Sequence, residues 1–368
     1  MPTTFSHINR KTDFILRPEI YHSFIVKKME KIKEEYRILK EKRKKKSEPE
    51  KPVSIWTEKD VYNGEVVDAL VVIFRTSGCR WHKKRGCSMC GYFVDTAHVT
   101  KEDLLKQIDY ASKQHTSQPV VKVFTSGSFF DEEEFPTEAR SHLLTTFKKA
   151  RKFIFETRPE FVKKKTLESF KDIGKEIEIA VGLESSNDHI LKYVINKGFR
   201  FSDYIKVAKI IKEEGFKLKT YLLLKPPFLT EFEAIEDTLK SIYDIVPYAD
   251  TISINPINVQ NFSFVAYLWR ERLYRAPWFW SLLEVLKKAH ETTEKENVRL
   301  LSSPTGAGTE RGIHNCRKCD PYIKKAVERY SLNGSFSSLQ VPECRCIDKW
   351  KDEIEFSSFY MSEVFFES

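Results

Sequence analysis

The feature of this 368-residue chain that most restricts its fold is an alternation between apolar runs and amphipathic segments. Each apolar run is typical of a buried strand, and the segment after it has helical periodicity. Six such repeats predict an α/β fold with a parallel sheet and right-handed crossovers, which curls into a partial (β/α)6 barrel. A seventh strand could lie at 298–302. The six predicted strands lie at 69–75, 120–125, 153–157, 177–183, 218–224 and 251–257.

The alternation divides the chain into three predicted regions. Residues 1–52 form an N-terminal helical, basic extension, residues 53–304 the core barrel, and residues 305–368 a small Cys-rich, metal-stapled region. A helix is predicted over 22–46, and its basic end could contact RNA phosphate, although such a run is more often a solvated helix end. The helix has one apolar stripe, made by Ile25, Met29, Ile32, Tyr36 and Leu39.

Three cysteines follow the first predicted strand, at the strand end where α/β folds place their chemistry. Cys79, Cys87 and Cys90 have the spacing C-x7-C-x2-C. A structural zinc ion takes four ligands, whereas three thiolates on a [4Fe–4S] cluster leave one iron open to a small molecule. The alternative is a zinc knuckle completed by His82 or by a distant cysteine. The position after a strand favours the cluster.

Four more cysteines lie near the end of the chain. Cys316 and Cys319 form a C-x2-C pair, and Cys344 and Cys346 form a C-x-C pair. Four thiolates from a short tail predict a closed tetrahedral structural zinc site, because a small region with little core needs such a staple. A second [4Fe–4S] cluster is the competing interpretation.

The cysteine content and the apolar pattern also predict a compartment. Seven cysteines are too few for a disulfide scaffold in a chain of this length, and their division into three and four suits two metal centres in a reducing cytosol. No apolar run reaches transmembrane length, and the N-terminus lacks an apolar signal core. We therefore expect a cytoplasmic protein with no membrane partner. The net charge of +9 favours a polyanionic partner, although solubility alone also explains it.

The first cysteine loop resembles the signature of the radical S-adenosylmethionine (SAM) superfamily. Its segment Cys87-Ser88-Met89-Cys90-Gly91 has the expected pattern of the last two cysteines and a glycine, although the first gap is longer than the commonest one. The resemblance implies that Cys79, Cys87 and Cys90 hold a [4Fe–4S] cluster whose open iron binds the amino and carboxylate groups of SAM. It also implies the partial barrel fold that the alternation predicts.

The resemblance further implies that polar groups at the ends of successive strands bind SAM. Ser126, Gly127 and Ser128 occupy the place of the glycine-rich SAM motif, but the usual acidic member is missing and Asp131 lies too far along. The third and fourth strand ends resemble those of the Elp3-like branch of tRNA-modifying enzymes. The predicted cofactor-binding residues are Ser126, Gly127, Ser128, Glu156, Glu184, Ser185 and Lys225.

Several of these side chains have equally plausible structural roles. Glu156 could pair with Arg158, and Glu184 could bind the SAM ribose or the substrate, but each could instead be solvated at a strand end. Amide and guanidinium groups near the sixth strand could read a base edge in the barrel, although Asn255-Pro256 is also a common turn start. The predicted substrate-binding residues are Asn255, Asn258, Gln260 and Arg311.

A segment at 269–280 mixes arginines with aromatic residues, a combination that suits RNA binding. We assign its tryptophans to the core and leave its arginines open. His314 is expected to be structural, and no catalytic residue is predicted.

Several motifs together resemble a narrower family, the archaeal radical SAM subunit of archaeosine synthesis, over most of 53–350. They are Cys87 to Tyr92, Asn255 to Gln260, Leu273 to Trp278 and Arg311 to Cys316. The resemblance implies a lyase that cleaves a carbon–nitrogen bond in a lysine-linked 7-cyano-7-deazaguanine adduct at tRNA position 15, leaving archaeosine. It implies tRNA, a separate lysine-transferring subunit and a low-potential electron donor as partners.

Two other functions stay open from the sequence. One is a different radical SAM modification of RNA, by a methylthiotransferase or an Elp3-type enzyme. The other is a non-catalytic, zinc-stapled tRNA-binding protein. Methylthiolation usually needs a second cluster, so the metal bound by the tail distinguishes these alternatives.

Overall fold

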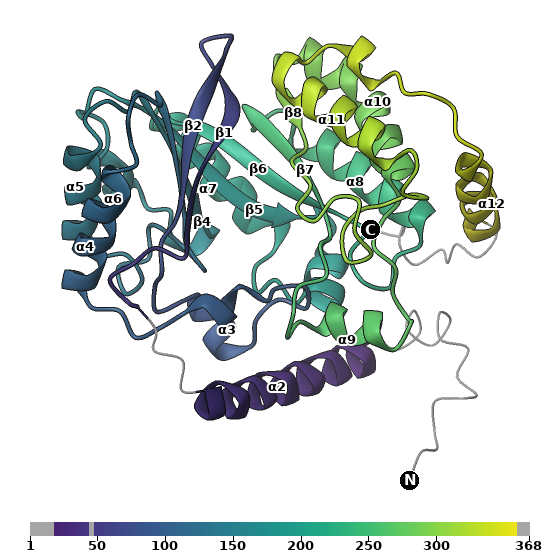
Figure 1. Ribbon diagram of the computed structural model, residues 1–368, viewed down its shortest axis with the longest axis horizontal. Helices are drawn as coiled ribbons and strands as arrows, with labels where there is room; N and C mark the ends of the chain where they lie inside the picture. The colour runs from purple at the N-terminus through teal and green to yellow at the C-terminus, as the bar shows by residue number, and fades with distance from the viewer. Residues whose placement is uncertain (1–17, 44–47, 359–368) are drawn as a thin grey trace.

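A curled eight-stranded sheet forms the centre of the computed structural model, which describes residues 18–43 and 48–358 (Figure 1). The strands are neighbours in chain order, β1 being antiparallel to β2 and every later pair parallel. This architecture confirms the predicted α/β half-barrel, including the additional strand near 298–302. The strands are β1 Ser54–Tyr62, β2 Glu65–Ile73, β3 Val120–Phe124, β4 Lys152–Thr157, β5 Glu176–Glu184, β6 Lys217–Leu224, β7 Thr251–Pro256 and β8 Arg299–Leu301.

The strand that the sequence analysis did not predict is β1, which pairs with β2 in a hairpin. The ladder runs from Ser54 opposite Ile73 to Tyr62 opposite Glu65, so the connecting loop has only two residues. These are Asn63 and Gly64, both with positive φ (51° and 79°), the backbone that a two-residue hairpin of the mirror-image type requires. The Asn-Gly dipeptide between two strand-like runs is the sequence signal from which this hairpin could have been predicted.

Helices cover the outer face of the sheet and both of its ends (Figure 1). Side-chain caps fix two of the helix starts: Thr100 and Asp103 form a capping box on α4, and Thr230 and Glu233 form one on α8. The helices are α2 Pro18–Arg43, α3 Arg80–Lys84, α4 Lys101–Ser112, α5 Thr137–Thr146, α6 Lys164–Glu168, α7 Phe201–Glu213, α8 Glu231–Ile245, α9 Phe264–Arg270, α10 Phe279–Lys295, α11 Asp320–Asn333 and α12 Cys346–Ser358.

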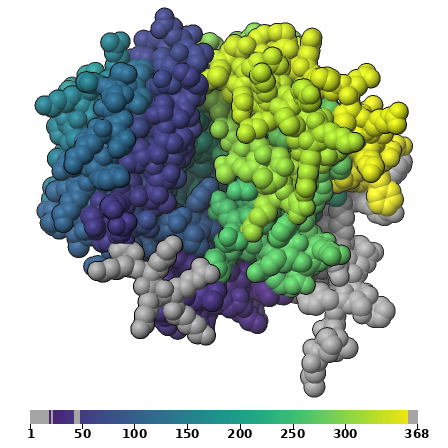
Figure 2. Space-filling view, in the orientation of Figure 1, coloured from purple at the N-terminus to yellow at the C-terminus, as the bar shows by residue number. Residues whose placement is uncertain are grey.

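The inner face of the half-barrel is charged, in contrast to the apolar outer face. Lys122 of β3 is 7% exposed, and its ammonium lies 2.6 Å from Asp60 and 2.7 Å from Glu58, both on β1. Asp60 also binds Arg299 of β8 at 2.7 Å. Because β1 and β8 are the two edge strands, the ion pair between Asp60 and Arg299 connects the open edges of the sheet. The surface remains hollowed between the β1–β2 hairpin and the C-terminal region (Figure 2).

Helix α2 lies across the end of the barrel, beside α3 and α9 (Figure 1). Ile25 and Met29 are buried and belong to the same apolar core as the barrel, and Ile32 is also buried. The first part of the predicted apolar stripe is therefore confirmed, whereas Leu39 is 41% exposed. Parts of the predicted terminal regions, 1–17, 44–47 and 359–368, lie outside the described residues, and the predicted region boundaries stay predictions.

Within residues 18–43 and 48–358, no helix combines the length and the apolar character that crossing a membrane requires.

Because Ile25 is fully buried, Ile25→Ala should lower the free energy of unfolding by about 2–5 kcal/mol. The matched variant Leu39→Ala, on the exposed side of the same helix, should change it by less than about 0.5 kcal/mol. Urea unfolding at constant pH measures both. Equal effects of the two variants would show that α2 is not part of the cooperative core.

Candidate functional site

The loop with the first three cysteines is held by backbone contacts to distant segments. Ser88, inside the C-x2-C turn, donates its N–H to Ile195 O (2.8 Å) and accepts from Phe264 N (2.9 Å). Cys79 precedes α3, and Gly78 before it has φ 85°, which a residue with a side chain rarely adopts. The loop is therefore positioned by the helical turn Ile190–Ile195 that follows β5, by α9 and by its own glycine turn at the C-terminal end of β2.

The three thiols lie in partly buried, cationic surroundings. Burial raises the pKa of Cys79, and burial followed by the neighbouring Cys87 thiolate raises the pKa of Cys90 to about 12. Arg158 and Lys197 lie close enough to the cysteines to interact with them electrostatically. A thiolate is the form that binds metal, so these cations and a bound metal together would stabilise the ionised state.

The three sulfurs of the first loop do not converge on one point as the ligands of a single metal ion do. Among the residues that the structure describes, the cysteines that gather within 4.8 Å of one another are those of the tail, not Cys79, Cys87 and Cys90. A cubane cluster holds its thiolates farther apart than one ion does, because each thiolate binds a different iron. The loop therefore suits a cluster with one open iron.

His82 does not complete a zinc knuckle with these cysteines. Its ring stacks on Phe93 with the centroids 4.1 Å apart, and its buried Nδ1 has no hydrogen-bond partner in the described part of the chain. Burial lowers the pKa of His82 to about 4, so the ring is neutral at pH 7. A neutral imidazole is the form that binds zinc, so what speaks against the zinc alternative is that His82 belongs to no converging group of metal ligands among the described residues.

The loop after β3 touches the cysteine loop at Gly127. A Cβ built on Gly127 would lie 2.6 Å from Cys79 Cα, so no other residue fits without displacing one loop. Ser128 Oγ accepts from Arg158 N (3.0 Å), while Ser126 is half-buried, with its Oγ 3.5 Å from Tyr92 O. The three residues predicted from the glycine-rich motif therefore lie directly beside the first cysteine.

Glu134 holds these two loops together, and the sequence analysis did not identify it. Its carboxylate accepts from Thr76 Oγ1 and from Ser128 N, both at 2.7 Å, and burial raises its pKa. Within the acidic run 132–134, no local signal distinguished it from its neighbours. Asp131, which the sequence analysis judged too far along the chain to be the acidic member of the motif, is fully buried and accepts from Arg80 Nε at 2.6 Å.

Glu156 lies on the inner face of β4 and interacts with Tyr221, not with Arg158. In the sheet Glu156 is opposite Ala180, whose small side chain leaves room between β4 and β6. Burial raises the pKa of Glu156 to about 7, opposed by a hydrogen bond with Tyr221. The predicted pairing with Arg158 is wrong, because the chain leaves the strand after Thr157.

Arg158 itself turns toward other groups. It donates to Glu160 Oε1 at 2.6 Å and to Lys197 O at 3.0 Å. It thus links the end of β4 to the segment that follows β5.

Glu184 lies at an irregularity of β5 and pairs with a lysine that the sequence analysis missed. Lys197 Nζ donates to Glu184 Oε1 at 2.7 Å, and the backbone of Glu184 has φ 78°. A Cβ on Gly182 would lie 3.1 Å from this carboxylate oxygen, so the glycine makes space for the pair. Strained non-glycine backbone of this kind is concentrated at functional sites.

The remaining two cofactor candidates have partners inside the protein. Ser185 is fully buried and donates to Asp237 Oδ1 at 2.7 Å. Lys225 forms an ion pair with the buried Glu231, and its carbonyl accepts from Tyr274 OH at 2.8 Å. Their contact with a cofactor stays a prediction.

Of the four substrate candidates, Gln260 lies at the cysteine loop. Its Oε1 accepts from Gly91 N at 2.6 Å and thereby fixes the residue after the C-x2-C pair. Asn255 accepts from Ser253 Oγ at 3.1 Å. Asn258 lies against Gly306, where a Cβ would be 2.7 Å from its Oδ1.

Arg311, the fourth candidate, lies on the tail segment that packs against the end of β7. Its Nε donates to Val259 O at 2.8 Å, and its carbonyl accepts from Val259 N at 2.7 Å. Its guanidinium also lies 5.1 Å from the ring centroid of Trp269. These contacts join the tail to the barrel near the cysteine loop.

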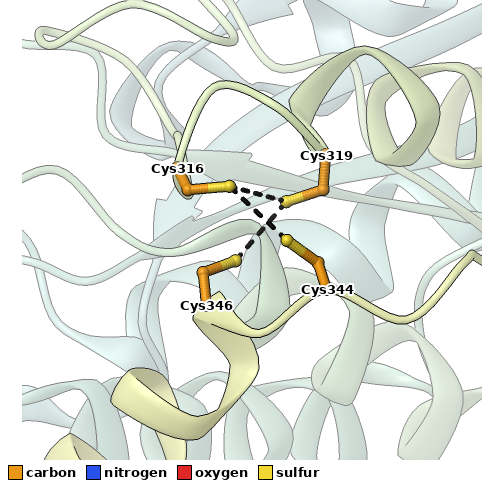
Figure 3. Close-up of side chains that lie close together, drawn as sticks. All are labelled: Cys316, Cys319, Cys344 and Cys346. Carbon is orange, nitrogen blue, oxygen red and sulfur yellow. Dashed lines mark hydrogen bonds between the residues drawn. The ribbon is translucent and has the colours of Figure 1, made fainter.

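The four tail cysteines converge on one point (Figure 3). Cys316 Sγ lies 3.6 Å from the sulfurs of Cys319 and Cys344, and Cys319 Sγ lies 3.5 Å from Cys346. A tetrahedral ion with Zn–S bonds of about 2.3 Å separates its sulfurs by about 3.8 Å. The geometry thus matches a single tetrahedral metal ion, while the iron atoms of a cubane would spread the four sulfurs more widely.

Known proteins resemble this chain over most of its length. The sequence model of the radical SAM superfamily matches residues 73–242. The chain is 41% identical over 317 residues to archaeosine synthase subunit beta of Methanosarcina acetivorans, covering 84% of this chain and 91% of that protein. The Thermococcus kodakarensis subunit of the same name is 37% identical over 317 residues, covering 82% and 97%. The solved structure of queuine lyase from Clostridium spiroforme aligns with a TM-score of 0.46 and 21% identity, covering 68% and 94%.

The buried pair of Ser185 and Asp237 should make stability depend on pH. Burial raises the pKa of Asp237 to about 7, above its unfolded value of about 3.9. A carboxyl with a raised native pKa costs stability as it ionises, so the contribution of Asp237 to the free energy of unfolding falls as pH rises from about 4 to about 7.

The variant Asp237→Asn keeps an oxygen that can accept from Ser185 but does not titrate. Relative to wild type, the variant should gain at least about 1 kcal/mol of unfolding free energy between pH 4 and pH 8. A difference that stays constant with pH would contradict a protonated Asp237.

Proposed function

Because this chain belongs to the radical SAM superfamily and, within it, to the family of the archaeosine synthase beta subunits, we propose that it is a tRNA lyase of archaeosine synthesis. It would cleave a carbon–nitrogen bond within a lysine-linked deazaguanine on tRNA and leave the amidine of archaeosine. The similarity of 41% over most of the chain carries this proposal, and the packing of Gly127 against Cys79 supports it. The subunit naming of the relatives supports a partner subunit, which would be the lysine-transferring enzyme under this proposal, and the reaction needs a low-potential electron donor.

The early cysteine loop would hold the cluster of this enzyme. Cys79, Cys87 and Cys90 supply three thiolates and leave one iron open. Held there and reduced by the electron donor, the cluster would supply the electron for reductive cleavage of SAM to methionine and a 5′-deoxyadenosyl radical. The backbone of 126–128, which lies against Cys79, is positioned to bind the amino group of SAM.

The residues around this loop control charge and water. Arg158 and Lys197 offset the negative charge of the thiolates, and the Glu184–Lys197 pair lies between the cysteine loop and the inner face of the sheet. A buried site of this kind excludes water from a reactive intermediate. Glu156 and Glu184 remain available on the inner face to position a polar group of SAM or of the substrate.

We propose that the tail quartet binds structural zinc. The sulfur separations of 3.5–3.6 Å support a single tetrahedral ion. The expectation that the tail has little core is wrong, because Cys319 and Cys346 are buried in the same apolar core as the barrel. This assignment disfavours a methylthiotransferase, which usually needs a second cluster.

The function is tested by mass spectrometry of tRNA nucleosides. The reconstituted protein is incubated anaerobically with SAM, a reductant and tRNA that carries the lysine adduct. We expect archaeosine in the tRNA, together with methionine and 5′-deoxyadenosine, and neither product with Cys90→Ser. Formation of 5′-deoxyadenosine without archaeosine would overturn the proposed substrate. Absence of both products from cluster-loaded protein would overturn the enzymatic role.

The two metal sites should be separable by one substitution in each. Cys90→Ser should lose most of its iron and its visible absorbance but keep about one zinc per chain. Cys344→Ser should lose zinc and melt at a lower temperature, because structural zinc contributes to folding. Elemental analysis and thermal melts measure both effects. Loss of iron and sulfide from Cys344→Ser, with no zinc in the wild type, would show that the tail holds a second cluster.

A further inference from the structure

We propose that a groove beside the barrel mouth binds a single-stranded segment of the tRNA. The inference rests on the proposed function, which makes tRNA the substrate, and adds the surface that holds it. We call this surface the arginine groove. Its volume is about 1190 Å³. Its lining comes from four segments, not every residue of which faces the groove: 225–230 after β6, 269–275 at the end of α9 and beyond it, 310–317 of the tail and 353–357 of α12.

The unneutralised charge at the arginine groove is positive. Arg270 and Arg272 are exposed, and neither forms an ion pair or a side-chain hydrogen bond with another residue of the described chain. Of the two acidic residues in the lining, Glu310 pairs with Arg317, and Glu353, which accepts from Trp278 Nε1 at 2.8 Å, interacts electrostatically with Arg275. A phosphate backbone would supply the missing counter-charge.

One wall of the arginine groove is rigid. The guanidinium of Arg275 lies 3.9 Å from the ring centroid of Trp278 and donates to His314 O at 2.9 Å. Cys316 lines the same wall, two residues after His314. The metal site of the tail therefore holds in place the segment that Arg275 binds.

The arginine groove also exposes apolar and aromatic surface on which bases can stack. Leu273 is 49% exposed, and Trp269 is half-buried beneath Arg311. Aromatic side chains beside arginines are typical of single-stranded RNA sites, where they stack on unpaired bases. The volume also exceeds the roughly 300–1,000 Å³ that holds a drug-sized ligand, so several nucleotides fit.

The arginine groove lies at the same end of the barrel as the candidate active site. Lys225 lines the groove and directly follows β6, whose C-terminal end lies at the same edge of the sheet as that of β2. Helix α9, which leads into Arg270, begins at Phe264, whose N–H donates to Ser88 in the C-x2-C turn. An RNA strand in the groove would therefore run toward the mouth of the barrel.

The test compares two charge reversals of equal size. Arg270→Glu/Arg272→Glu changes the groove, and Lys106→Glu/Lys113→Glu changes two exposed lysines at α4, on the opposite side of the sheet (Figure 1). Anaerobic titration of each cluster-loaded protein with adduct-bearing tRNA, at several salt concentrations, measures affinity. We expect the groove variant to bind at least about tenfold more weakly and its salt slope to fall by about 1 to 2, with less than about threefold weakening of the control.

Reductive cleavage of SAM without tRNA separates this proposal from the proposed function. Both variants should form 5′-deoxyadenosine at the wild-type rate, which shows that fold and cluster are intact. Equal tRNA affinity of the two variants would overturn the groove while the function stands. Unchanged tRNA affinity with lost binding of the partner subunit would make the groove a protein-docking surface and overturn the proposal. If the wild type cleaves SAM but binds no tRNA, the proposed function fails and the groove proposal fails with it.

Discussion

The close approach of two strand-end loops is the constraint on which the candidate site depends. β2 and β3 are parallel neighbours, so their C-terminal ends meet at one edge of the sheet. The loops touch because Gly127 has no side chain to hold Cys79 away. Glu134 then joins them through hydrogen bonds with Thr76 and with Ser128. A group bound by the cysteines consequently lies next to exposed backbone that can bind a second ligand.

The charged side chains buried inside the half-barrel are a second constraint on the site, because each needs an oppositely charged partner. Burying Lys122 or Lys197 without a partner would cost several kcal/mol, and each has a carboxylate within 3 Å. The first pair lies deep between β3 and β1, and the second lies near the cysteines. A chain of paired ions thus leads from the floor of the half-barrel to the site. This arrangement lets a water-poor interior carry charge near the reacting groups.

The tail contributes to the same site from the other side. Its four cysteines bring the start of α11 and the start of α12 together, and the segment before them packs on the end of β7 through Arg311. Because Arg275 binds the carbonyl of His314, a metal ion in the tail also positions a basic surface at the barrel mouth. The tail cysteines and the arginine groove are in this way parts of one assembly.

Local pattern in the sequence determined the parallel strands, the N-terminal helix and both cysteine groups, since each depends on residues that lie near one another in the chain. The hairpin at Asn63-Gly64 was also locally encoded, although it was not predicted. The tertiary structure alone decided the partners of Glu134, Lys197 and Glu156. Those contacts join different strands and loops, and the direction of a side chain at a strand end depends on backbone irregularities, such as the positive φ at Glu184, that periodicity does not reveal.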